Sequence, residues 1–162
     1  MNGAYQTVFE ISYFSNGSLL ESFAFLCAGI IAIVVIVFGW KFSKISRSKL
    51  ILFSYVGLPF WFLFSGFWFY SNISTGKMWT SALANNQCEV VEGIVQVLHQ
   101  QPWSGHDVGD HISIGGKDFT YSDYVETLGY HQTISHGGQL KNGVVARLHY
   151  IGDVILKVEI KQ

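Results

Sequence analysis

The sequence predicts an α+β protein in which an N-terminal transmembrane helical hairpin precedes a small, mostly β domain. Two observations predict this fold class. Long uncharged hydrophobic runs are confined to the chain before residue 71, and alternating β-branched residues begin after residue 87. Hydrophobic residues make up 49% of the 162 residues and charged residues only 13%, roughly half the share of an ordinary soluble domain.

These patterns divide the chain into four segments: a tail, a transmembrane region, a connector and a soluble β-rich ligand-binding domain. The expected bounds are 1–22, 23–70 (helices about 23–40 and 50–70), 71–87 and 88–162.

The first hydrophobic run, Phe23 to Trp40, carries no charge and is about long enough to cross a hydrocarbon core of about 30 Å. A signal peptide is the alternative, but no basic segment precedes the run and no A-x-A site follows it. Ala24, Ala28 and Ala32 form a stripe of small side chains, which predicts a homo-oligomer joined through the transmembrane helices. The alternative is that alanine is simply common in membrane helices.

The second run, Leu50 to Tyr70, is rich in Phe and Trp and also predicts a transmembrane helix. Gly57 and Pro59 interrupt it, which leaves a re-entrant segment as the alternative. The basic loop KFSKISRSK between the runs favours a cytoplasmic loop and a periplasmic C-terminus. The expected localisation is the bacterial inner membrane, multi-pass, with a cytoplasmic C-terminal domain only if that domain binds an intracellular messenger.

The soluble half predicts about five strands in an antiparallel sheet or a partly open barrel. The connector 71–87 is polar and has room for one short helix. Gly115-Gly116 and Gly152-Asp153 each join two alternating segments, which predicts two hairpins. The five expected strands are 88–98 (with a bulge at Gly93), 110–114, 117–122, 144–151 and 154–160.

Two long loops, 99–109 and 123–143, hold most of the polar chemistry. Aromatic rings there could stack on a base, glycines could let a phosphate approach the main chain, and cations could neutralise it. The simpler alternatives are core aromatics and an ordinary glycine turn. The predicted ligand-binding residues are Trp103, His106, Tyr121, Tyr130, His136, Gly137, Gly138, Lys141 and Arg147.

A hydrolase would need a nucleophile with a base, or paired carboxylates. The nearest approach to such a group is His106, Asp107, Asp110 and His111, a pattern that matches no metal-ligand spacing. We therefore expect no enzyme activity, no catalytic residue, no metal and no cofactor.

Two membrane helices followed by a β domain containing SDYVETLGYHQTISHGG resemble the small membrane effectors of type III CRISPR systems that bind cyclic tetra-adenylate. The resemblance implies a cytosolic domain that binds the messenger, oligomerises and acts on the bilayer in antiviral defence. The residues after Tyr70 carry about three net negative charges, which disfavours a four-phosphate ligand.

The sequence therefore leaves two main functions. One is a membrane-anchored receptor for cyclic oligoadenylate, with the lipid bilayer and further copies of the chain as partners and no DNA. The other is a non-enzymatic membrane binding protein, such as a toxin-immunity protein or an envelope-complex subunit, with a periplasmic C-terminal domain.

Overall fold

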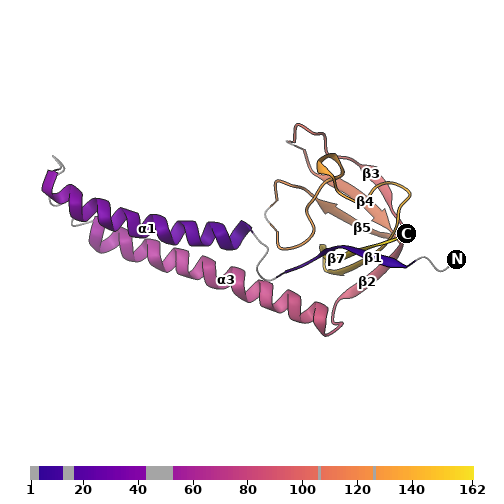
Figure 1. Cartoon of the computed structure of the whole chain (residues 1–162), viewed down its shortest axis with the longest axis horizontal. Coiled ribbons are helices and arrows are strands. Elements are labelled where there is room, and N and C mark those ends of the chain that lie inside the picture. The colour runs from indigo at the N-terminus through magenta and orange to yellow at the C-terminus, as the bar shows by residue number, and fades with distance from the viewer. Residues whose placement is uncertain (1–3, 13–16, 43–52, 106, 126) are drawn as a thin grey trace. The chain divides into compact units, whose positions relative to one another are not determined.

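The computed structural model describes residues 4–12, 17–42, 53–105, 107–125 and 127–162 (Figure 1). The predicted basic loop lies almost wholly outside the described residues, as do the side chains at 17–19, 21–22, 35–42 and 53–54. The chain forms two compact units. A helical unit comprises Asn16–Thr75, and a β-rich unit combines Met1–Ser15 with Gly76–Gln162.

The helical unit is built from α1 (Gly17–Phe42) and the first part of α3 (Leu58–Ala84), which the π-helical turn η1 (Phe53–Gly57) precedes. Gly57 and Pro59 do not interrupt a helix here. They lie where α3 begins, because a proline in the first turn of a helix removes an N–H that would have no intrahelical partner.

No helix among the described residues has both the length and the apolar character needed to bridge a bilayer. α3 starts later than the predicted helix 50–70 and continues through the polar segment expected to be a connector. Its mostly apolar part, Leu58 to Tyr70, is only about 20 Å long, against a hydrocarbon core of about 30 Å. The predicted transmembrane hairpin and the multi-pass inner-membrane localisation are therefore wrong.

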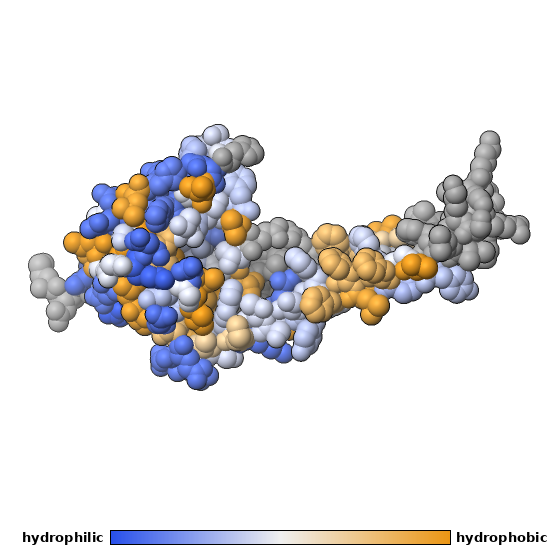
Figure 2. Space-filling view, turned by 180° about the vertical axis from the view of Figure 1, so that it is seen from behind, coloured by the Kyte–Doolittle hydropathy of each residue, from blue (hydrophilic) through white to orange (hydrophobic). Residues whose placement is uncertain are grey.

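The two helices approach each other at Gly29. A Cβ atom on Gly29 would lie 2.9 Å from Cδ1 of Trp61, so a larger side chain would push the helices apart. The indole Nε1 of Trp61 donates a hydrogen bond of 3.1 Å to the carbonyl oxygen of Phe25. Ala24 and Ala28 are exposed. Many larger apolar side chains of this unit are also exposed, as Figure 2 shows.

Sheet A of the β-rich unit has the strand order β1-β7-β6-β2, and all neighbours are antiparallel. Its strands are β1 (Tyr5–Glu10), β2 (Glu89–Ile94), β6 (Val145–Ile151) and β7 (Val154–Lys161). The segment expected to be an N-terminal tail thus supplies an edge strand. Tyr5 pairs with Lys161 and Glu10 with Lys157.

Sheet B has the order β3-β4-β5, with β3 (Gln96–His99), β4 (Asp110–Ile114) and β5 (Lys117–Tyr121). Both predicted hairpins are confirmed. Gly115 and Gly116 have φ of 58° and 84°, and Gly152 has φ of 61°, values that glycine adopts at no steric cost.

The described residues form seven strands in two sheets, instead of five strands in one sheet or barrel. The predicted strand 88–98 bends at Val95, so that β2 pairs with β6 while β3 pairs with β4. The N–H of Val95 donates to Val144 and its carbonyl oxygen accepts from Gly143, both at 2.8 Å. Because its backbone is held in this corner, the segment serves both sheets.

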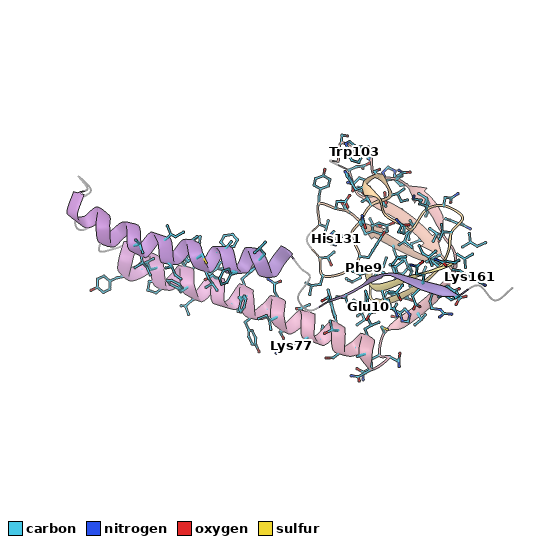
Figure 3. All side chains as sticks on the ribbon, viewed as in Figure 1. Phe9, Glu10, Lys77, Trp103, His131 and Lys161 are labelled. Atoms are coloured by element: carbon cyan, nitrogen blue, oxygen red, sulfur yellow. The ribbon has the colours of Figure 1, made fainter. Side chains whose placement is uncertain are left out.

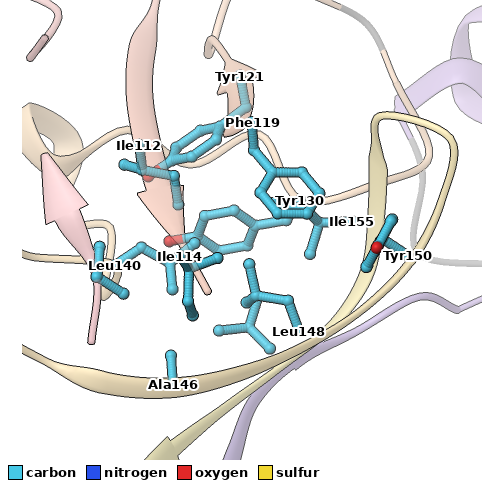
Figure 4. Packing of buried hydrophobic residues seen from close by; sticks show 12 residues of the cluster. Ile112, Ile114, Phe119, Tyr121, Tyr130, Leu140, Ala146, Leu148, Tyr150 and Ile155 are labelled. Carbon is cyan, nitrogen blue, oxygen red and sulfur yellow. The ribbon is translucent and has the colours of Figure 1, made fainter. Parts of the chain in front are cut away.

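The core lies between the two sheets (Figure 4). Alternation decides which side chains enter it: on β6, Ala146, Leu148 and Tyr150 are buried, whereas Arg147 and His149 lie on the other face. Phe119 packs edge-on against Tyr150, with ring centroids 5.0 Å apart. This two-sheet core supports the long loops that follow β3 and β5.

Candidate functional site

The predicted ligand-binding residues do not converge on one site. Trp103, His136 and the adjacent Gly137 and Gly138 come together where the two long loops meet. The remaining residues have other positions. Tyr121 and Tyr130 are buried in the core, Lys141 lies in the turn before β6, Arg147 lies on the outer face of sheet A, and His106 is outside the described residues.

We define the loop face as the described residues of the two long loops, which are 99–105, 107–109, 122–125 and 127–138. Trp103 is the most exposed aromatic residue among them. Its side chain is 73% exposed, and Figure 3 places it at the far end of the β-rich unit from Lys161. One side of the indole packs on the imidazole of His136, with ring centroids 4.5 Å apart and planes inclined by 30°. The indole is therefore held by His136 while much of its surface faces solvent.

His136 is fixed by an acidic partner. Its Nδ1 lies 2.8 Å from Oδ2 of Asp123 and 3.1 Å from the hydroxyl of Thr133, which itself donates to Asp123. The backbone N–H of Thr133 donates to the other Asp123 oxygen at 3.0 Å. Partial burial alone would raise the pKa of Asp123, but the hydrogen bonds from Thr133 and His136 outweigh it and lower the pKa. The ionised carboxylate thus orients the imidazole beneath Trp103.

The two glycines after His136 shape the turn. Gly137 has φ of 95° at the end of the 3-10 turn η2 (Ile134–His136). A Cβ atom on Gly138 would lie 2.4 Å from the carbonyl oxygen of Gln132. Glycine is therefore required at both positions by the local backbone, which gives an account of this motif without a phosphate.

A buried carboxylate that the sequence suggested only as a catalytic group joins the two loops. Asp110 is fully buried and accepts hydrogen bonds from the backbone N–H of Gln101 at 2.8 Å and of Ile134 at 2.6 Å. Ser122 donates to the side-chain oxygen of Gln101 at 2.7 Å. This polar cluster places Trp103 and His136 by fixing the loop that carries each of them.

Two buried polar atoms beside this cluster lack a hydrogen-bond partner among the described residues: the amide nitrogen of Gln101 and the hydroxyl of Tyr121. Burial also raises the pKa of Tyr121, so its hydroxyl keeps its proton. Each unpaired group costs about 1–3 kcal/mol, which a bound polar group would relieve.

An open pocket of about 230 Å³ lies beside Tyr121 and Ser122. It is smaller than the 300–1,000 Å³ that is typical of drug-sized ligands, so it suits a single ring or a short side chain. The lining is mostly apolar. It consists of Val108, Thr120, Tyr121, Ser122, Val125, Thr127, Tyr130, Asp153, Val154 and Ile155.

The arginine expected to meet phosphate is engaged elsewhere. Arg147 Nε and Nη2 donate to one oxygen of Glu92 at 3.0 and 2.9 Å, and its guanidinium lies 4.1 Å from the ring centroid of Tyr5. It therefore belongs to the charged outer face of sheet A.

Asp107 and Asp110, which were considered for catalysis, have different hydrogen-bond partners. His99 Nε2 lies 2.7 Å from Asp107, whereas Asp110 is committed to backbone N–H groups. The described residues contain no group of three His, Cys, Asp or Glu side chains arranged to hold a metal ion.

The chain matches no protein family model, and neither a curated protein nor a solved structure is detectably similar to it. The resemblance to CRISPR-associated effectors therefore gains no support from known proteins, and function has to be argued from the loop face itself.

Proposed function

We propose that the β-rich unit is a nucleotide-binding module in which a base stacks on Trp103, and that cyclic oligoadenylates are the class of nucleotide it recognises. The observation that carries this proposal is a solvent-exposed indole held against His136. An exposed tryptophan fixed in orientation offers a flat apolar surface, and stacking a base on such a surface contributes about 1–3 kcal/mol.

The structure supports recognition of a base more strongly than recognition of phosphate. The polar side chains on the loop face include His99, Gln100 and Gln132, which suit hydrogen bonds to base edges. Arg147 is held by Glu92 on the outer face of sheet A. We therefore expect affinity to depend weakly on salt, because few counterions are released when few cations contact phosphate.

The two loops also have the properties of a site that responds to a ligand. They are joined by Asp110, contain the unpaired buried amide nitrogen of Gln101 and border the small pocket lined by Tyr121 and Tyr130. A base on Trp103 would extend a stack that already joins the two loops, since Trp103 and His136 belong to different loops. Binding would then stabilise their joined arrangement.

The direct test is titration of the full-length chain with cyclic tri-, tetra- and hexa-adenylate, and with adenosine and linear oligoadenylate for comparison. Trp103→Leu removes the stacking surface and should weaken binding about 5- to 150-fold, whereas Trp103→Phe should retain part of the affinity. Trp68→Leu in the helical unit is the matched control and should bind normally. Absence of binding to every nucleotide, or normal binding by Trp103→Leu, would refute the proposal.

A second proposal concerns the helical unit, which we infer associates with the same unit of another copy. Its exposed aromatic ladder favours this partner: Phe60 stacks on Phe64 at 6.5 Å and Phe64 on Trp68 at 6.3 Å. Phe60 and Phe64 are 70% and 59% exposed, and the small side chains of Ala24 and Ala28 are exposed on α1. Contiguous exposed apolar surface of this kind marks an interaction site, and a second copy is the simplest self-complementary occupant.

Sedimentation of the full-length chain tests this association. We expect a dimer or larger species that Phe64→Glu shifts toward monomer, while Val90→Glu at an exposed position of β2 leaves it unchanged. A monomeric wild-type chain would contradict the proposed association.

A further inference from the structure

A thiol, an imidazole and a carboxylate lie in line on the outer face of sheet A, away from Trp103. Cys88 is free, partly exposed and immediately precedes β2, and its Sγ lies 3.8 Å from Nδ1 of His149 on β6. The other imidazole nitrogen, Nε2, lies 3.3 Å from Oε2 of Glu159 on β7. The residue before β2 and the neighbouring strands β6 and β7 therefore present the three groups in the order that activated thiols require.

Glu159 decides which imidazole nitrogen faces the thiol. Partial burial would raise the pKa of Glu159, but hydrogen bonds from Lys157 and His149 lower it overall, so the carboxylate is ionised. An ionised carboxylate accepts a hydrogen bond and cannot donate one, so Nε2 of His149 carries the proton. In the neutral imidazole, Nδ1 then has a lone pair that faces Cys88.

The surroundings of His149 supply both space and charge. A pocket of about 220 Å³ is lined by His149 together with Lys157, Glu10, the end of α3, including Thr80 and Ala84, and Asn86 just after it. Lys157 Nζ lies 3.0 Å from Glu159 and 3.6 Å from Glu10. Arg147 is the other cation here, with Nη1 3.8 Å from Glu159. Two cations thus face the cluster from β6 and β7.

We propose that Cys88 is a reactive thiol site at which His149 acts as the base and Glu159 as the positioning residue, and that it takes low-molecular-weight disulfides. Nδ1 of His149 accepts the thiol proton while Sγ attacks one sulfur of the disulfide. The reagent's S–S bond breaks, a new Cys88–S–S–R bond forms, and the departing thiolate takes up the proton. The thiol is oxidised and the reagent disulfide is reduced, so atoms and electrons balance.

The test uses the full-length chain with Cys27→Ser, which leaves Cys88 as the one thiol. Release of the coloured thiolate from 5,5′-dithiobis(2-nitrobenzoate) at pH 7 gives the rate, and the neutral reagent 2,2′-dithiodipyridine separates base assistance from attraction of a charged reagent. His149→Gln should slow both reactions about tenfold, because an unassisted cysteine is only a few per cent thiolate at pH 7, and Glu159→Gln should slow them less. The matched control is His111→Gln, which removes an imidazole from β4 of the same unit. It should react as wild type.

Circular dichroism and the rates in urea separate activation from misfolding. All variants should react equally when unfolded, and the wild-type advantage should exist only in the folded protein. Equal rates for folded wild type and folded His149→Gln, or equal slowing by His111→Gln, would overturn the proposal. If His149→Gln does not fold, wild-type Cys88 reacting more slowly when folded than in urea overturns it, and faster reaction when folded supports it.

Discussion

Replacing Asp110 by Asn should release the loop face with little change in side-chain volume. The carboxylate is fully buried and accepts one backbone N–H on each oxygen, from Gln101 at 2.8 Å and from Ile134 at 2.6 Å. An amide can accept only one of these bonds, and its NH₂ group would face the other N–H. Losing one charge-assisted bond costs about 1.5–3 kcal/mol, and weakening the second adds about 1 kcal/mol. The free energy that holds the two loops together should fall by about 3 kcal/mol.

Amide hydrogen exchange measured by mass spectrometry reports this loss directly. A change of about 3 kcal/mol corresponds to roughly 150-fold faster exchange in the segments around Gln101 and Ile134. Asp118→Asn on the exposed side of β5 is the matched control and should leave these segments unchanged. Exchange within threefold of wild type in Asp110→Asn would refute the assignment of this carboxylate as the joint between the loops.

Two further predictions follow from other parts of the β-rich unit. Because hydrogen bonds lower the pKa of folded Asp123 below its unfolded value of about 3.9, its stabilising contribution is present above pH 4 and is lost as pH falls through the lowered pKa. Acid titration of Asp123→Asn should therefore show a smaller loss of stability below pH 4 than wild type, and an identical profile would contradict this. Leu148→Ala, at a fully buried position of β6, should lower the free energy of unfolding by about 2–5 kcal/mol in urea titrations, whereas Val90→Ala, 52% exposed, should change it little. A loss under 1 kcal/mol for Leu148→Ala would show that the inter-sheet core is loosely packed.

The hairpins could be predicted from sequence because their determinants are local. Gly115-Gly116 and Gly152-Asp153 fix the turns, and period-two alternation sets which residues face the core. The strand Tyr5–Glu10 could not be predicted in the same way. It is an edge strand whose pairing with β7 joins the two ends of the chain, and a single short segment carries no signal of such a distant partner.

The helices show where composition misleads. Hydropathy predicted a membrane helix over 50–70 and a connector over 71–87. Instead, one helix, α3, runs from Leu58 to Ala84 through both segments. Nothing in the polar residues after Tyr70 breaks a helix, since proline is absent between Ser71 and Asn85. The continuation of the helix beyond Tyr70 could therefore have been predicted from the sequence. The burial of Gly29 against Trp61 could be seen only in the structure.

The loop face was partly predictable. Trp103 and His136 were both expected to touch a ligand, and the fold brings these two residues together. Arg147 was expected there too, yet it alternates with the buried Ala146 and Leu148 and must therefore lie on the opposite face of β6. Asp110 was considered only as a catalytic group, because the sequence cannot show that its oxygens would be needed by the backbone of two loops.

A hydrogen-exchange footprint of the full-length chain with and without cyclic tetra-adenylate tests nucleotide binding at the loop face most directly. Added nucleotide should slow exchange in 99–105 and 131–138, and Trp103→Leu should abolish that protection at the same ligand concentration. Protection confined to sheet A or to the helices, or no protection at saturating nucleotide, would contradict the account.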